Sequence, residues 1–116
     1  MAHDILIVDD EADIRMLTAG ILEDEGYRTR EASDSAHALN AVEARQPSLV
    51  LLDIWLEGSP ADGMEVLAKI RETHPAVPVV MISGHGNIET AVSAINIGAS
   101  DFIEKPFTAD RLIFVV

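Results

Sequence analysis

The sequence of 116 residues contains no cysteine and few aromatic residues, with one Trp, one Tyr and three Phe. The absence of cysteine excludes a disulfide-stabilised scaffold, a thiol nucleophile and a thiolate metal site. Apolar residues nevertheless make up 48% of the chain, which is enough for a folded core and argues against intrinsic disorder. The length fits a single domain.

Basic residues and long apolar runs are also scarce. Eight Lys and Arg face 20 Asp and Glu, so the formal net charge is −12. Because nucleic acids and anionic membranes are bound mainly through Lys and Arg, we expect neither as a partner. The longest apolar stretch, Ala76–Ile82, is interrupted by Pro78 and is far shorter than the roughly 20 residues that span a bilayer. The start of the chain lacks the pattern of a signal peptide, so we expect a soluble, cytoplasmic domain.

What the sequence does contain is an alternation of short apolar runs with segments of helical periodicity. After the first run, for example, residues recur at helical spacing at Ile14, Leu17, Thr18, Ile21 and Leu22. This alternation is typical of an α/β fold in which helices cover both faces of a parallel sheet. We therefore predict a doubly wound five-stranded parallel sheet in one domain, residues 1–116, with a final helix that is cut short. The predicted strands are Ile5–Val8, Tyr27–Glu31, Leu49–Leu52, Val79–Ile82 and Asp101–Glu104.

Polar residues follow four of these strands directly. Because parallel strands place their carboxyl ends at one edge of the sheet, where ligands bind, we expect these side chains to converge. A turn residue or a helix cap is the plain explanation for any one of them, but it does not account for the whole set. The set comprises Asp9 and Asp10 after the first strand, Asp53 after the third, Ser83 after the fourth and Lys105 after the fifth.

The chemistry of this set favours phosphoryl transfer. Clustered carboxylates repel one another unless a cation joins them, and a site of hard oxygen ligands without Cys or His favours Mg²⁺. A carboxylate beside Mg²⁺ can attack a phosphoryl group and form an acyl phosphate. Lys105 would offer a cation and Ser83 a hydroxyl to the phosphoryl oxygens. The sequence has no glycine-rich phosphate loop of the Walker type, so we do not expect an NTPase.

With these motifs, the whole chain resembles the receiver domains of two-component response regulators. The resemblance implies the flavodoxin-like (CheY-like) strand order 2-1-3-4-5 and the role of phosphoacceptor for Asp53. It further implies that Mg²⁺ is the cofactor. Its ligands would be Asp10, Asp53 and the backbone carbonyl of Trp55, with Asp9 acting mainly through water.

The same resemblance assigns roles on the phosphoryl side of the site. Ser83 and Lys105 would bind the phosphoryl oxygens, and the Lys105–Pro106 peptide bond would be cis. Ser83 and Phe102 would be the switch residues that move on phosphorylation. The alternative for Phe102 is a core or half-buried aromatic on the last strand. The surface that changes would comprise the fourth helix, the fifth strand and the final helix, and it would support a homodimer.

Two longer sequence segments resemble one group of receivers in particular, the nitrogen-regulatory NtrC group. Residues 83–92 and 98–107 are similar to that group, and Leu52–Leu56 with the long loop after it is most like the NtrX type. This implies a sensor histidine kinase (NtrY-like) as the phosphoryl donor. It also implies a σ54-dependent, nitrogen-related transcriptional output in domains that are absent from this chain. The chain itself would be a phosphoryl acceptor with limited self-phosphorylation and autodephosphorylation chemistry, not a turnover enzyme.

The segment after the predicted acceptor departs from the family pattern. Glu57 stands where receivers commonly carry a proline, and the loop Glu57–Asp62 is longer than usual, with Pro60 expected to set its turn. This loop keeps one alternative open, a pseudo-receiver that binds proteins and is never phosphorylated. A second alternative is a phosphatase of the haloacid dehalogenase type, which uses the same kinds of residue on a parallel sheet. It needs a second Asp two residues after the nucleophile, where this chain has Trp55.

Overall fold

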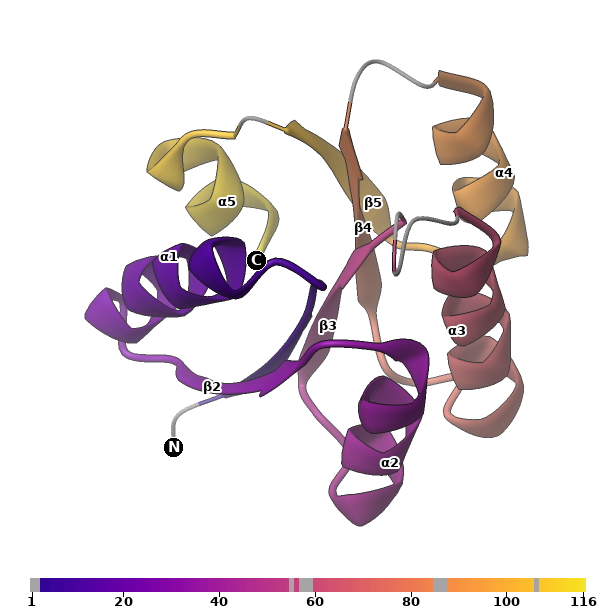
Figure 1. The fold of residues 1–116 in the computed structure, drawn as a ribbon, viewed down its shortest axis with the longest axis horizontal. Helices are drawn as coiled ribbons and strands as arrows, with labels where there is room; N and C mark the ends of the chain where they lie inside the picture. The colour runs from indigo at the N-terminus through magenta and orange to yellow at the C-terminus, as the bar shows by residue number, and fades with distance from the viewer. Residues whose placement is uncertain (1–2, 55, 57–59, 85–87, 106) are drawn as a thin grey trace.

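The computed structural model describes residues 3–54, 56, 60–84, 88–105 and 107–116. Within these residues, five strands alternate with five helices (Figure 1). The strands are β1 (Asp4–Val8), β2 (Arg28–Ala32), β3 (Leu49–Asp53), β4 (Val79–Gly84) and β5 (Asp101–Lys105). The helices are α1 (Ala12–Asp24), α2 (Ser35–Ala44), α3 (Pro60–Thr73), α4 (Ile88–Ile97) and α5 (Ala109–Val115).

The strands form one parallel sheet in the order β2-β1-β3-β4-β5. The interior strands β1 and β3 carry continuous apolar runs because both faces of the sheet are covered. The edge strand β2 is polar and largely accessible, as its sequence predicted. The predicted fold class and the strand order 2-1-3-4-5 are confirmed.

Two layers of helices enclose the sheet (Figure 1). Successive residues of a strand point to opposite faces, so each strand contributes to two separate cores. Ile5 and Ile7 pack with residues of α1 and α5 on one face. Leu6 and Val8 pack with residues of α2, α3 and α4 on the other face. The predicted polar residues lie at or just after the ends of the strands, at the carboxyl edge of the sheet.

The first helix differs in two details from its sequence pattern. Its buried residues are Thr18, Ala19 and Leu22, whereas Leu17, expected on the buried stripe, is 57% exposed. Gly26, at φ +92°, turns the chain after the helix, and the Tyr27 N–H donates to the Leu22 carbonyl. Tyr27 therefore belongs to the helix end, and β2 begins one residue later than predicted.

The segment expected to be a long loop after Asp53 is also shorter than predicted. Pro60 is the first residue of α3, where its fixed φ is suited to the first helical turn, so residues 60–62 are helical. Of the predicted loop, residues 57–59 lie outside the described part of the chain.

An ionic cluster ties together the amino end of the sheet. The Asp4 carboxylate of β1 accepts hydrogen bonds from Arg30 Nη2, at 2.7 Å, and from Arg45 Nε, at 3.2 Å. Arg30 also donates to the carbonyl oxygens of Ala41 and Arg45, at 2.8 Å each. Burial alone would raise the pKa of Asp4, but the hydrogen bonds and charges of the two arginines outweigh it and hold that pKa below its usual value.

The last helix begins directly after Thr108. The side-chain oxygen of Thr108 caps α5 by accepting a hydrogen bond from the Arg111 N–H at 3.1 Å. Among the residues that the structure describes, no helix has the length and apolar character needed to cross a bilayer.

Candidate functional site

The topology brings the predicted polar residues to one edge of the sheet. Asp53 is the last residue of β3 and pairs with Ile82 of β4, so Ser83 follows at the next position. In β5, Lys105 is the last residue and pairs with Gly84. Asp9 continues β1 and donates its N–H to the Ala32 carbonyl of β2 at 3.1 Å. Four neighbouring strands therefore deliver polar groups to the same place, as the parallel sheet requires.

The Lys105 ammonium joins two of the predicted carboxylates. Its Nζ donates to Asp9 Oδ2 at 3.0 Å and to Asp53 Oδ2 at 3.1 Å. Asp9 and Asp53 are only 1% and 3% exposed, so these charge-assisted bonds form largely out of water. Burial alone would lower the pKa of Lys105, but the hydrogen bonds and charges of Asp9 and Asp53 outweigh it and raise that pKa. Lys105 is therefore held as a cation throughout the physiological pH range.

The acidic residues form a cluster that fits a hard divalent cation. Carboxylate oxygens of Asp9, Asp10 and Asp53 lie within 4.8 Å of one another, with Asp10 exposed and the other two buried. Three carboxylates against one ammonium leave an excess of negative charge, and Mg²⁺ prefers oxygen ligands of this kind. The donor set therefore fits Mg²⁺. The backbone carbonyl of Trp55, predicted as a further ligand, lies outside the described residues.

Asp9 is fixed by its surroundings as well as by Lys105. Its Oδ1 accepts a hydrogen bond from the Glu11 N–H at 2.9 Å. Its carbonyl oxygen accepts one from Arg15 Nη1 at 2.7 Å, and Arg15 Nε donates to Glu31 Oε1 at 3.2 Å. Arg15 is a residue of the site that the sequence pattern did not reveal. An arginine in the first turn of the helix after an acidic pair is visible in the sequence, but its bond to a main-chain carbonyl has no sequence signature.

Gly63 lets α3 approach the end of β3. A Cβ atom at this position would lie 2.7 Å from the Asp53 carbonyl oxygen and would collide with the Ile54 carbonyl oxygen. Both obstructing atoms belong to the main chain and cannot rotate away. Gly63 lies inside α3 and is required by close packing behind Asp53.

The predicted switch residues occupy different environments. Ser83 is 4% exposed and lies in β4, between the strands that carry Asp53 and Lys105. Phe102 lies on β5 with 37% of its surface exposed, so it is not a core aromatic. The predicted cis bond involves Pro106, which lies outside the described residues.

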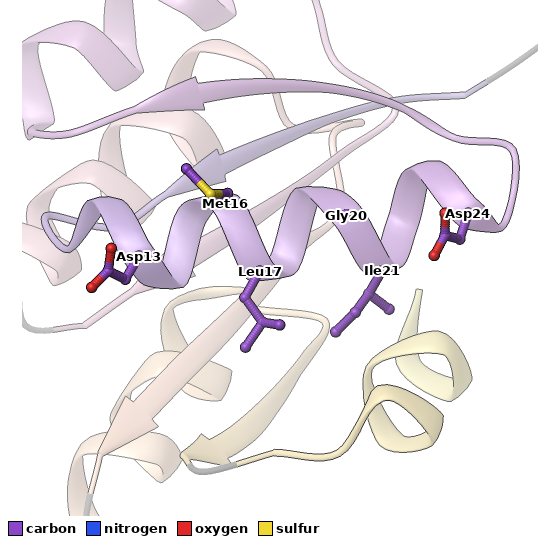
Figure 2. A pocket seen from close by; sticks show the side chains of 6 residues that line it. All are labelled: Asp13, Met16, Leu17, Gly20, Ile21 and Asp24. Atoms are coloured by element: carbon purple, nitrogen blue, oxygen red, sulfur yellow. The ribbon is translucent and has the colours of Figure 1, made fainter.

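A hollow lies on α1, where it is lined by six residues between Asp13 and Asp24 (Figure 2). The side chains of Leu17 and Ile21 point to the same side of the helix, and Asp13 and Asp24 mark the ends of the hollow. None of the predicted site residues lines it. The hollow therefore shares no lining residue with the acidic cluster that Lys105 contacts.

Comparisons with known proteins agree with this geometry. A family model described as the response regulator receiver domain matches residues 5–116. The nitrogen assimilation regulatory protein NtrX of Azorhizobium caulinodans is 67% identical over 115 residues, which are 99% of this chain and 25% of that protein. The chemotaxis protein CheY of Bacillus subtilis is 39% identical over 114 residues, which are 97% of this chain and 93% of that protein.

The structural comparison gives the same result. The crystal structure of the receiver domain of NtrX from Brucella abortus superposes with a TM-score of 0.92 at 67% identity, covering 97% of this chain and 93% of that one. The chain spans about a quarter of the length of the NtrX-type relatives it matches. The family model, the strand order and these relatives together show that the chain belongs to the family of response regulator receiver domains.

Proposed function

We propose that the chain accepts a phosphoryl group on the carboxylate of Asp53 and changes its surface in response. The contact of the Lys105 ammonium with both Asp9 and Asp53, beside the acidic cluster, carries this proposal. A buried carboxylate at the carboxyl edge of a parallel sheet can act as a nucleophile if the incoming negative charge is compensated. Lys105 supplies part of that compensation from the protein itself.

Mg²⁺ would be held by the carboxylates of Asp10 and Asp53 and by the backbone carbonyl of Trp55, with Asp9 acting through water. When bound, it would neutralise the excess negative charge of the cluster and of the phosphoryl oxygens. The buried position of Asp9 and Asp53 keeps these charges poorly solvated, which strengthens their need for a cation.

The transfer step follows from the chemistry of a carboxylate nucleophile. An oxygen of Asp53 attacks phosphorus, and a new O–P bond forms as the N–P bond of a phosphohistidine donor breaks. The electron pair of the N–P bond stays on the imidazole nitrogen, and the ring, protonated on its other nitrogen, leaves as neutral histidine. Lys105 Nζ and the Ser83 hydroxyl donate hydrogen bonds to the phosphoryl oxygens, for which Lys105 exchanges its bond to Asp53.

The donor in this proposal is a sensor histidine kinase of the NtrY-like kind. Membership of the receiver family supports a histidine kinase as donor, and a relative named as a nitrogen assimilation regulatory protein supports a role in nitrogen regulation. Because this relative is about four times longer, we further propose that residues 1–116 are the receiver domain of such a regulator. Its σ54-dependent output would lie in other domains.

The response would be a shift between two conformations, led by Ser83 and Phe102. Val92 and Ile95 of α4 and Phe102 of β5 are exposed apolar side chains on neighbouring elements. An altered arrangement of these residues, together with α5, would favour a homodimer through this face.

Intact-mass spectrometry after incubation with acetyl phosphate and Mg²⁺ tests the proposal. We expect one added phosphoryl group on the wild type and on Asp24→Asn, an exposed control on α1, and none on Asp53→Asn. Equal addition to Asp53→Asn would refute the role of acceptor. A folded wild type that takes up no phosphoryl group would indicate a pseudo-receiver, and steady turnover of an aryl phosphate would indicate a phosphatase.

A further inference from the structure

Asp9 and the residue after it form the acidic part of the site, yet they are held very differently. Asp9 is buried and bonded at its N–H, its carbonyl oxygen and both carboxylate oxygens. Asp10 is exposed, although one of its carboxylate oxygens lies within 4.8 Å of those of Asp9 and Asp53. The position of Asp10 must therefore be set largely by the main chain that carries it.

Arg15 contacts this main chain at the peptide unit between Asp9 and Asp10. Its Nη1 donates to the Asp9 carbonyl oxygen at 2.7 Å, and that carbonyl belongs to the peptide unit that links Asp9 to Asp10. A peptide unit is planar, so fixing its oxygen also fixes the direction in which the Asp10 backbone leaves it. The side chain of Arg15 is only 18% exposed, which favours a persistent bond over one that water replaces.

The guanidinium group is itself held in place by β2. Arg15 Nε donates to Glu31 Oε1 at 3.2 Å, and the next residue of the strand, Ala32, accepts the Asp9 N–H at 3.1 Å. Two adjacent residues of β2 therefore fix Asp9, one directly and one through Arg15. Within α1, the Arg15 N–H donates to the Glu11 carbonyl, so Arg15 stands one turn after the residue whose N–H binds Asp9 Oδ1.

We propose that Arg15 is a positioning residue for the divalent-cation site: it fixes the Asp9–Asp10 peptide and thereby keeps the Asp10 carboxylate at the metal. This role rests on the proposed function, because it presumes that Mg²⁺ binds at the acidic cluster. Residues that orient metal ligands typically change metal affinity about 10- to 100-fold when they are replaced. Arg15 acts through the main chain and does not itself contact the cation.

Calorimetric titration of the full chain with MgCl₂ tests the role, with thermal unfolding as the check on folding. We expect Arg15→Gln to weaken Mg²⁺ binding about tenfold. Arg15→Lys, which can still donate to the Asp9 carbonyl, should recover most of the affinity. Arg28→Gln removes an arginine from the exposed amino end of β2 and makes the same change in net charge, so it should bind Mg²⁺ like the wild type.

A double variant separates positioning from a general effect on charge or stability. If Arg15 acts through Asp10, Arg15→Gln should lower the affinity much less in an Asp10→Asn background than in the wild type. Equal losses in the two backgrounds would overturn the proposal, as would wild-type affinity in a folded Arg15→Gln variant.

Two further outcomes are decisive. If Arg15→Gln does not fold, Glu31→Met carries the test: it removes the acceptor of the Arg15 Nε hydrogen bond without touching Asp9, and it should weaken Mg²⁺ binding about two- to threefold. Unchanged affinity of Glu31→Met would then overturn the role. A folded wild type that binds no Mg²⁺ would overturn the proposed function, whereas loss of the Arg15 effect alone leaves that function standing.

Discussion

At the amino end of the sheet one carboxylate, Asp4, is bound by two guanidinium groups. At the carboxyl end three carboxylates lie together, and the Lys105 ammonium contacts two of them. The cluster at the amino end thus carries more positive than negative charge, and Arg30 also donates to main-chain carbonyls. The carboxyl end has an excess of negative charge in a buried place.

This difference indicates that the carboxylate at the amino end serves stability, whereas the carboxylates at the carboxyl end serve function. A carboxylate that is fully bonded to arginines stabilises the folded state, and its removal leaves donors without their acceptor. A carboxylate in an acidic cluster does the reverse, because like charges repel in the folded state more than in the unfolded chain. We infer that neutralising a carboxylate at the two ends should change stability in opposite directions, whereas only the carboxylates of the carboxyl end should affect phosphorylation.

The largest effect is expected when the single ammonium of the carboxyl end is removed. Lys105→Met should lower the initial rate of phosphorylation by acetyl phosphate about 100-fold or more, since one preorganised donor to the developing charge is lost. Quantitative mass spectrometry over time measures this rate. Lys69→Met is the matched control, because the other lysine of the chain is exposed on α3. Equal rates for the two variants would show that Lys105 does not take part in the transfer.

The next largest effect is expected where α3 packs against the end of β3, the strand that carries Asp53. Gly63→Ala should destabilise the fold by about 3 kcal/mol, because its Cβ would press on main-chain oxygens of Asp53 and Ile54. Urea unfolding gives this change. Gly20→Ala is the control, since a Cβ there meets nothing within 4 Å and should stabilise α1 slightly. A Gly63→Ala variant as stable as Gly20→Ala would show that α3 can move away from β3.

At the amino end, Asp4→Asn should destabilise the protein by about 2 kcal/mol at pH 7, because both arginines lose a charged acceptor. The folded-state pKa of Asp4 is lowered, so its contribution exists above the unfolded pKa of about 3.9 and is lost as the pH falls through the folded value. Urea unfolding of wild type and variant from pH 7 to pH 2 checks this. A difference that persists at the acid end would contradict the ionic origin.

The smallest expected effect has the opposite sign. Asp10→Asn, in the absence of divalent cations, should stabilise the protein by about 0.5 kcal/mol, because it removes one of three clustered negative charges at an exposed position. Adding salt should shrink the gain, since screening already weakens the repulsion. Thermal unfolding at low and high ionic strength measures both. A loss of stability at low salt would mean that Asp10 is bonded as favourably as Asp4.

The carboxyl end of the sheet was foreseeable from the sequence, and the amino end was not. Apolar runs that end in Asp53 or Lys105 indicate parallel strands, and the topology of such sheets brings their ends together. No such sequence pattern predicts the cluster of Asp4, Arg30 and Arg45. It depends on the register of β1 against β2 and on where α2 ends, which only the folded chain determines.

Dependence on contacts in the folded chain also explains the details of α1, α3 and Arg15 that the sequence did not predict. Thr18 and Leu22 of the predicted stripe of α1 are buried, but Leu17 of the same stripe is exposed and Ala19 is buried in its place. Pro60 signals a turn or a first helical residue equally well, and packing of Gly63 against β3 favours the helix. Contacts made by a side chain with a distant main-chain group, such as that of Arg15, leave no periodic pattern to detect.

The most direct test of the contrast is the thermal unfolding midpoint with and without Mg²⁺, for the wild type, Asp53→Asn and Asp4→Asn. A ligand that binds only the folded state raises the midpoint according to its affinity. We predict a clear rise for the wild type and for Asp4→Asn. For Asp53→Asn we predict a higher midpoint than wild type without Mg²⁺, because Asp9 then has Lys105 to itself, and little further rise when Mg²⁺ is added. Equal Mg²⁺ responses in all three proteins would contradict the account.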